Sequence, residues 1–208
     1  MTNLQFKMNY MNKKSQRSRF TLRSITDDFF TLDEYPIPKN EIDKFEEKIL
    51  TTYGVLTVDG LKTMFKGIDT RNKIFYDLGC GGGRAVIISY INHCFKKAVG
   101  VELSESRLKC ANSYLEKLND SNLNIHFYEN DIFNIDFSEA DIIYVSNLCF
   151  PKSLNQKLGQ KIDKLIKSGA ILFTSTPINI TINHRVETII NVKQSWKEDS
   201  LIYKYTIL

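Results

Sequence analysis

A short apolar strand that ends in a glycine-rich loop and continues into an apolar helix constrains this chain more than any other feature. The segment FYDLGCGGGRAVIISYI, residues 75–91, carries Asp77 shortly before Gly79, Gly81 and Gly83. In α/β proteins such a turn links a parallel strand to a helix, and its backbone comes close to a bound ligand. The segment therefore predicts a parallel sheet with a ligand site at the glycine loop.

Strand-like and helix-like patterns alternate through the rest of the chain. Strands that alternate with helices predict a mostly parallel sheet with helices on both faces. The last two strands have no long helix between them, so they predict an antiparallel hairpin at the edge of a seven-stranded sheet. Strands are expected at 73–77, 97–102, 123–129, 141–146, 170–175, 186–192 and 201–207, and helices at 40–53, 61–68, 83–95, 104–118 and 153–166.

The N-terminal residues have a charge pattern of their own. Six cations and no acid lie between Met1 and Arg23, the first of them at Lys7, and four acids follow from Asp27 to Glu34. The basic block is open to three interpretations: an arm that contacts nucleic acid or an acidic protein surface, a transit peptide, or a solvated tail. We expect residues 1–38 to form a basic, partly disordered extension and residues 39–208 to form the sheet domain.

Composition argues against several other classes of protein. No apolar run reaches the about 20 residues that cross a bilayer, so no membrane segment is expected. The four cysteines, Cys80, Cys94, Cys110 and Cys149, form no CxxC pair and have no histidine cluster nearby. This arrangement argues against a structural zinc site and for a reducing compartment. We therefore expect an intracellular protein, in the nucleus or the cytoplasm, without a metal.

The spacing of the glycines limits what the loop can bind. A P-loop requires lysine and then serine or threonine after its last glycine, and neither follows here. A dinucleotide loop has the spacing GxGxxG and holds a pyrophosphate, which the carboxylate of Asp77 would repel. The same carboxylate would attract the ammonium of an amino acid. S-adenosylmethionine joins an amino acid to a nucleoside without phosphate, and this cofactor fits the loop.

Acidic residues also follow the next two strands. Glu102 ends the second strand about 20 residues after the loop, where a carboxylate can accept hydrogen bonds from both ribose hydroxyls. Asp131 follows the third strand and can accept a hydrogen bond from the exocyclic amine of adenine, while Ile132 packs on the ring. Either acid alone would be typical of a solvated loop. Together with the glycine loop, at three successive strand ends, they indicate a cofactor site.

The segment SNLCFP, residues 146–151, follows the fourth strand, where ligands bind in open parallel sheets. The amide oxygen of Asn147 can accept a hydrogen bond from an incoming amine, and the ring of Phe150 can shelter a developing cation. These residues favour methylation of a nitrogen. The alternative is that Asn147 is a turn residue and Phe150 a core residue. Trp196 and Tyr203, near the C-terminus, are equally open to ordinary packing.

Seven segments together resemble one enzyme family. Their order along the chain, over residues 53–206 or about three quarters of its length, is similar to that in the disruptor-of-telomeric-silencing family, the non-SET core-histone lysine methyltransferases. The resemblance implies the class I methyltransferase fold and S-adenosylmethionine-dependent methylation of a protein lysine, above all a lysine of a histone in the nucleosome. The segments are TYGVLTVDGLKTM, FYDLGCGGGR, VGVELSESRLKCA, ENDIF, VSNLCFP, FTSTP and SWKEDSLIYKYTI.

The resemblance also implies which residues contact the cofactor. A loop at the start of the matched region would close over the methionine end, the glycine loop would hold that end, and the two later acids would hold ribose and adenine. The implied cofactor residues are Tyr53, Gly54, Thr57, Asp77, Gly79, Gly81, Glu102, Asp131 and Asn147. Ile132, inferred above from its place beside Asp131, completes the set of cofactor candidates.

The acceptor lysine has its own implied residues. Asn147 would lie beside the transferable methyl group. Phe150, Trp196 and Tyr203 would form a narrow hydrophobic channel for the lysine side chain, so that Asn147, Phe150 and Tyr203 are the catalytic candidates. Four positions depart from the usual residues of the family, namely Val55, Arg84, Ile132 and Thr176.

Other functions remain open from the residues. Asn147-Leu-Cys-Phe150 has the length of the Asn-Pro-Pro-Tyr element of enzymes that methylate an exocyclic amine of a nucleic acid base, although it lacks both prolines. The lysine could also belong to a protein other than a histone. A third class is a non-catalytic partner subunit that only binds the cofactor. The basic block from Lys7 to Arg23 is the candidate for contact with nucleic acid.

Overall fold

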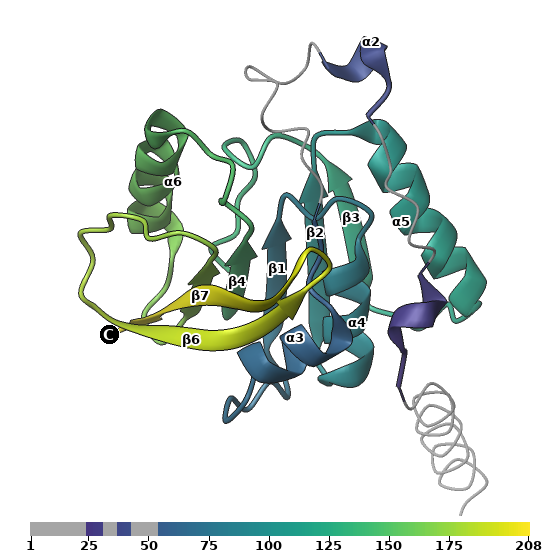
Figure 1. Ribbon diagram of the computed structural model, residues 1–208, viewed down its shortest axis with the longest axis horizontal. Coiled ribbons are helices and arrows are strands. Elements are labelled where there is room, and N and C mark those ends of the chain that lie inside the picture. The colour runs from purple at the N-terminus through teal and green to yellow at the C-terminus, as the bar shows by residue number, and fades with distance from the viewer. Residues whose placement is uncertain (1–23, 31–36, 43–53) are drawn as a thin grey trace, which may run out of the picture.

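The computed structural model describes residues 24–30, 37–42 and 54–208. Strands β1 to β5 run parallel, and β7 lies antiparallel between β5 and β6. The expected α/β fold, a seven-stranded mostly parallel sheet with a C-terminal antiparallel hairpin, is therefore confirmed (Figure 1). The strand order is β3-β2-β1-β4-β5-β7-β6, with bounds β1 Ile74–Leu78, β2 Lys97–Glu102, β3 Ile125–Glu129, β4 Ile142–Val145, β5 Ile171–Thr174, β6 His184–Gln194 and β7 Lys197–Ile207.

Helices cover both faces of the sheet, as the sequence predicted (Figure 1). Helices α3, α4 and α5 contribute to the core cluster on one face, and α6 contributes to the cluster on the other. The site described below therefore rests on a three-layer scaffold. The described helices are α2 Lys39–Ile42, α3 Val58–Met64, α4 Arg84–Asn92, α5 Glu105–Leu118 and α6 Lys152–Leu165, with a short 3-10 helix η1 at Asp27–Phe29.

Side chains of the parallel strands alternate between the two faces, because successive Cβ atoms of a strand point to opposite sides. In β1, Phe75 joins the α3–α5 cluster and Tyr76 the α6 cluster; in β4, Ile142 and Ile143 divide in the same way. Both faces are buried, which explains why these strands are nearly continuous apolar runs in the sequence. In β1 and β4 the polar side chains Asp77 and Tyr144 lie toward the carboxyl ends of the strands.

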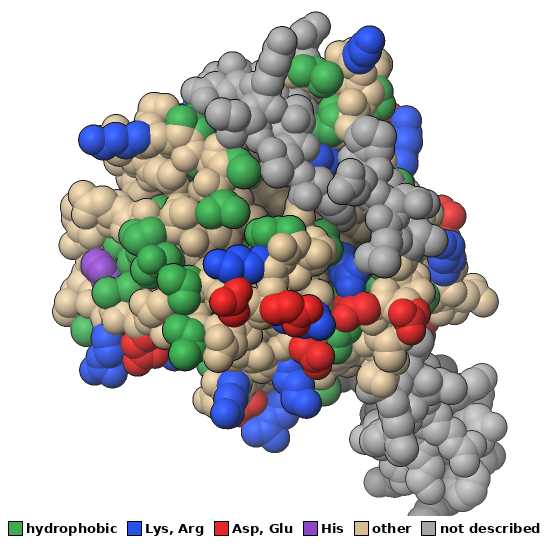
Figure 2. Space-filling model, in the orientation of Figure 1, with side chains coloured by type: hydrophobic (Ala, Val, Ile, Leu, Met, Phe, Trp, Pro, Cys, Tyr) green, Lys and Arg blue, Asp and Glu red, His purple; other side chains and the backbone are tan. Residues whose placement is uncertain are grey.

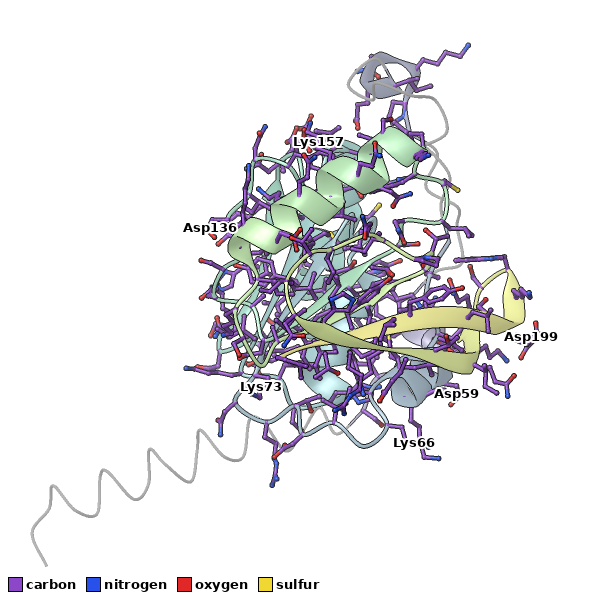
Figure 3. The ribbon with its side chains drawn as sticks, turned by 90° about the vertical axis from the view of Figure 1, so that its left-hand side faces the viewer. Asp59, Lys66, Lys73, Asp136, Lys157 and Asp199 are labelled. Carbon is purple, nitrogen blue, oxygen red and sulfur yellow. The ribbon has the colours of Figure 1, made fainter. Side chains whose placement is uncertain are left out.

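The C-terminal hairpin is longer than the sequence indicated. β6 and β7 span 11 residues each. The outer part of β6 packs closely on α3, where a Cβ on Gly60 would overlap the carbonyl oxygen of Lys193, and Leu56 forms a bridge with Gln194. Figure 3 shows Asp199, near the hairpin turn, on the same side of the molecule as Asp59 of α3. The hairpin therefore supports the segment just before α3.

Some helices end earlier than expected. The helix predicted to reach Ile68 ends at Met64, and Gly67 follows in the left-handed region with φ of 78°. The helix predicted over 83–95 ends at Asn92, with Cys94 at φ of 57°. The helix expected from Asn40 begins at Lys39, and its expected residues beyond Ile42 lie outside the described ranges.

The described part of the N-terminal extension packs on the sheet domain. Ile25 and Phe30 are 4% and 3% exposed and belong to the α3–α5 core cluster. The basic block from Lys7 to Arg23 lies outside the described residues, so its contact with nucleic acid stays a prediction, as does the division at residue 38. Among the described residues, no helix combines the length and the apolar character needed to cross a membrane.

Candidate active site

A cavity lies at the carboxyl ends of β1, β2, β3 and β4. Its walls come from the glycine loop after β1, the loops after β2, β3 and β4, and the segment 54–56 before α3. Figure 2 shows the surface of the molecule in the orientation of Figure 1, with acidic side chains gathered near the middle of the view. The predicted site residues that line the cavity are Gly54, Asp77, Gly79, Gly81, Glu102, Asp131, Ile132 and Phe150.

The glycine loop is shaped for a ligand without phosphate. Gly79 and Gly81 have positive φ angles of 90° and 53°, and a Cβ on Gly79 would meet no atom within 4 Å. The N–H groups of Gly79 and Cys80 donate to the carbonyl oxygen of Val101 at 2.8 and 2.9 Å, and that of Gly81 donates to Glu102. These donors are therefore already used and do not form a cradle for a pyrophosphate.

The third glycine of the loop has a structural role. Gly83 precedes α4 with φ of 76°, and a Cβ there would lie 2.5 Å from the ring of Phe127 and 2.8 Å from the Cβ of Ala111. Gly83 therefore lets α4 pack against β3 and α5, whereas Gly79 leaves open space beside the cavity.

Asp77 lines this cavity and has one buried carboxyl oxygen that accepts no hydrogen bond from the described residues. The side chain is 3% exposed, and this oxygen is its Oδ1. Burial, and next the charge of Glu102, raise the pKa of Asp77 to about 8. A buried carboxylate without a cation is costly, so this position suits a ligand that brings an ammonium group. The amino acid end of S-adenosylmethionine supplies one.

Glu102 is held between two loops. Its Oε2 accepts from the N–H of Gly81 at 2.8 Å, and its Oε1 accepts from the N–H groups of Leu103 and Ser104, both at 3.0 Å. A carboxylate oxygen has two lone pairs, so Oε2 keeps one for a ligand hydroxyl. The three backbone donors fix the carboxylate in one orientation at the cavity, which suits recognition of a ribose.

The third acid closes the cavity at the β3 end. Asp131 forms a turn in which its Oδ1 accepts from the N–H of Phe133 at 2.8 Å. Ile132 and Phe133 line the cavity beside it and give an apolar surface for a flat ring. Strand order therefore sets the order of groups along the rim: Asp131 after β3, Glu102 at the end of β2 and Asp77 in β1.

Sequence reasoning missed two polar residues at the carboxyl end of β4 in this cavity, Tyr144 in the strand and Ser146 just after it. Tyr144 is aligned with Asp77 in the β1–β4 pairing, and both Tyr144 and Ser146 line the cavity. Burial raises the pKa of Tyr144 to about 12, although the neighbouring hydroxyls of Ser175 and Ser146 lower it, so the phenol stays protonated. The alternation of DIIYVS was the available signal, because it puts Tyr144 and Ser146 on one face.

Asn147 has a different environment from the one that the sequence suggested. It is fully buried, and it does not line the cavity. Its Nδ2 donates to Asn155 Oδ1 at 2.7 Å and to the carbonyl oxygen of Thr176 at 3.2 Å, and its Oδ1 accepts from the N–H of Thr176 at 2.9 Å. The amide thus ties the end of β4 to α6 and to the segment after β5. Its role beside the methyl group stays a prediction.

The other acceptor residues are spread over the hairpin and the β4 loop. Trp196 is 45% exposed at the hairpin turn, and its ring occupies the space that a Cβ on Gly54 would need. Tyr203 of β7 is aligned with Thr174 of β5 and packs against the same apolar cluster as Phe150. Of these aromatic residues, Phe150 lines the cavity, and the channel formed by all of them stays a prediction.

Thr57 and Tyr53 were also predicted to contact the methionine end of the cofactor. Thr57 caps α3: its Oγ1 accepts from the N–H of Gly60 at 3.0 Å and donates to the carbonyl oxygen of Lys193 at 3.1 Å. Thr57 does not line the cavity, and Tyr53 lies outside the described residues. Among the described residues there is no cluster of three or more metal-ligating side chains.

Comparisons with known proteins agree with this geometry. The model of a family described as "Histone methylation protein DOT1" matches residues 36–201. A "Protein-lysine N-methyltransferase" of Saccharolobus islandicus (strain REY15A) is 34% identical over 100 residues, which cover 48% of this chain and 60% of that protein. A "Histone-lysine N-methyltransferase, H3 lysine-79 specific" of Eremothecium gossypii is 27% identical over 175 residues, which cover 74% of this chain and 30% of that protein.

Solved structures show the same fold. An RNA methyltransferase from Salinibacter ruber, in complex with S-adenosyl-L-homocysteine, superposes with a TM-score of 0.56 and 23% identity, covering 71% of this chain and 89% of that chain. At this identity the likeness describes the fold alone. The matched part of this chain spans 60% and 30% of the lengths of the two curated relatives.

Proposed function

Because the chain belongs to the DOT1 family of histone methylation proteins and has the class I methyltransferase fold, we propose that it transfers a methyl group from S-adenosylmethionine to a lysine side chain of a protein. A histone is the leading substrate, since the Eremothecium relative carries that activity in its name. The Saccharolobus relative carries the broader name of a protein-lysine methyltransferase, so a non-histone substrate is the second choice. A histone substrate would require the chain to reach chromatin.

One observation supports the cofactor most strongly. Asp77 has a buried carboxylate oxygen that accepts no hydrogen bond from the described residues, one strand away from Glu102, while the N–H groups of Gly79, Cys80 and Gly81 already donate to protein oxygens. A phosphate ligand would meet negative charge and few free donors. A ligand with an ammonium at one end and a ribose in the middle would meet two matching carboxylates.

The chemistry asks little of the protein beyond alignment. When bound, S-adenosylmethionine supplies an electrophilic methyl group on a positively charged sulfur. The residues of the cavity bind and orient the cofactor, and apolar residues such as Phe150 exclude water from the acceptor side. The pKa of a free lysine is about 10.4, and desolvation lowers it toward neutrality, which frees the nitrogen lone pair. We therefore assign no general base.

A labelling experiment tests the proposal. The protein is incubated with S-adenosylmethionine that carries a tritiated methyl group, together with one acceptor in each reaction. The acceptors are nucleosomes, free histones, other cell protein and nucleic acid. We expect label on lysine of the protein fractions, with histones or nucleosomes labelled most, and no label with a Glu102→Gln variant. Label on nucleic acid alone would overturn lysine methylation. Cofactor binding without label in any fraction would favour a non-catalytic partner subunit.

A further inference from the structure

The N-terminal segment 24–30 docks against the starts of two helices that frame the cavity. Its helix η1 lies beside α4 and α5 (Figure 1). Phe29 and Phe30 pack on the ring of Tyr114 of α5, with centroids 5.8 and 5.0 Å apart. At the far end of α4, Asn92 Oδ1 accepts from the N–H of Ile25, and its Nδ2 donates to the carbonyl oxygen of Ile25, both at 2.7 Å.

Asp27 makes the contacts nearest to the cavity. Its Oδ1 accepts from the N–H of Val58, the first residue of α3, at 3.0 Å. The same oxygen forms an ion pair with the guanidinium of Arg84, the first residue of α4. Arg84 is 5% exposed, and its guanidinium also lies over the ring of Phe30, 5.1 Å from the centroid. A single carboxylate oxygen thus joins the starts of two helices.

Both helices continue directly from walls of the cavity. The segment 54–56 ends two residues before α3, and the glycine loop ends at the residue before α4. Ala85 lines the cavity, while its neighbour Arg84 does not. The two walls are far apart in the sequence, and Asp27 contacts the start of the helix that follows each of them. The contacts of Asp27 therefore link the two walls, while the hairpin holds the segment 54–56 from its other side.

We propose that Asp27 is a positioning residue for the cofactor cavity: it fixes the segment 54–56 relative to the glycine loop through Val58 and Arg84. The inference rests on the proposed function in one respect, since its readout is the binding of S-adenosylmethionine or its demethylated product. On this proposal the segment 24–30, which follows the basic block, supports the cofactor cavity of the sheet domain. Loss of the contact would leave each wall folded but free to move relative to the other.

The same segment offers matched controls. Asn92→Ala removes the two hydrogen bonds to Ile25 at the other end of α4, so it loosens the segment without touching either wall. Asp28→Asn removes an exposed neighbouring charge and leaves the Asp27 contacts intact. Arg84→Gln removes the ion pair from the other side, and the double variant Asp27→Asn/Arg84→Gln measures the coupling between the two residues.

The experiment measures unfolding in urea and the Kd of S-adenosylhomocysteine by calorimetry for each variant. We expect Asp27→Asn and Asn92→Ala both to lower stability, but only Asp27→Asn to weaken binding, by about five- to tenfold, with a matching rise in cofactor KM and little change in kcat. Arg84→Gln should raise the Kd by a similar factor. The double variant should have a Kd no higher than that of either single variant. Asp28→Asn should bind like the unmodified chain.

Two results would overturn the inference. One is unchanged binding in Asp27→Asn. The other is equal weakening in Asn92→Ala, because binding would then follow overall stability rather than the relative position of the walls. Failure of the unmodified chain to bind S-adenosylhomocysteine is a separate outcome and would overturn the proposed function itself.

Discussion

The proposed cofactor side and the proposed acceptor side of the site differ in how the fold assembles them. On the cofactor side, Asp77, Glu102 and Asp131 come from consecutive strands of the chain and meet in one cavity. On the acceptor side, Phe150 reaches the cavity, but Asn147 is hydrogen-bonded to neighbouring protein groups. The carboxyl ends of adjacent parallel strands always lie on the same edge, so their residues converge by topology. Residues of the hairpin converge only where its length, twist and register bring them.

The largest effect is expected on the cofactor side, at Glu102. Glu102→Gln replaces one carboxylate oxygen by an NH2 group, which faces backbone donors instead of accepting from them. The variant also loses the charged acceptor for the ribose hydroxyls, and a hydrogen bond to a charged group contributes about 1.5–3 kcal/mol, so we expect affinity for S-adenosylhomocysteine to fall about 100-fold. Isothermal titration calorimetry measures it. Glu129→Gln is the control, because that side chain is exposed and aligned with Glu102 on the next strand. Similar losses of affinity in both variants would mean that Glu102 has no specific part in binding the ligand.

The next effect tests whether the acceptor side works through Asn147 itself. We expect Asn147→Ala to lower kcat about 30-fold and to change the Kd of the cofactor little, because a residue beside the transferred group acts mainly in the transition state. Asn155→Ala removes the partner of its Nδ2 and tests positioning alone. A smaller loss of kcat in Asn155→Ala supports a direct role. Equal losses in single-turnover assays would mean that Asn147 only holds the loop between β4 and α6.

The pH dependence of binding sharpens the assignment of Asp77. Its pKa is raised to about 8 in the free protein, while an ammonium ligand binds the ionised carboxylate. The affinity for S-adenosylhomocysteine should therefore rise with pH, by close to tenfold per unit below about pH 7.5, where the ligand ammonium stays charged. Methylthioadenosine, which lacks the amino acid end, should bind with a flat profile. A flat profile for both ligands would contradict the assignment.

The raised pKa of Asp77 makes the stability of the folded chain fall with rising pH, whereas it makes the affinity for the ligand rise. The folded chain without cofactor binds the Asp77 proton more tightly than the unfolded chain does. Its contribution to stability is therefore present at low pH and is lost as pH rises through about 8. Asp77→Asn should remove this loss in urea unfolding at pH 8 while it weakens cofactor binding, so that stability and affinity change in opposite directions.

The smallest effect is expected at the hairpin turn. Trp196→Ala removes a half-exposed ring that rests on Gly54, and we expect KM for the protein substrate to rise about threefold with little change in cofactor Kd. Leu201→Ala provides the comparison, since Leu201 is 46% exposed on the same hairpin and is not assigned to the channel. If both variants behave alike, Trp196 contributes only general surface contact.

Much of the cofactor side could be predicted from the sequence because its signals are local. Each acid follows an apolar run, and the open space beside Gly79 follows from a glycine where a side chain would intrude. Topology then brings these strand ends together. The sequence could not give the contact of Asp27 with Arg84, since it depends on how a distant segment docks. Nor could it give the hydrogen bond of Thr57 to Lys193 of β6, because the two residues are far apart in the sequence.

The acceptor side was harder to predict for the same reason. The sequence places Asn147 just after β4, but whether its amide points to the cavity or to Asn155 depends on the packing of α6. Tyr144 was hidden among apolar neighbours in β4, where a tyrosine is an ordinary strand residue. Only the register of β4 against β1 brings it beside Asp77.

The central claim is that the rim cavity binds a phosphate-free nucleoside joined to an amino acid. Its most direct test is calorimetric titration of the unmodified chain with S-adenosylhomocysteine and, in parallel, with a nicotinamide dinucleotide. We expect one binding site for S-adenosylhomocysteine and no measurable heat of binding for the dinucleotide. Binding of the dinucleotide without binding of S-adenosylhomocysteine would contradict it.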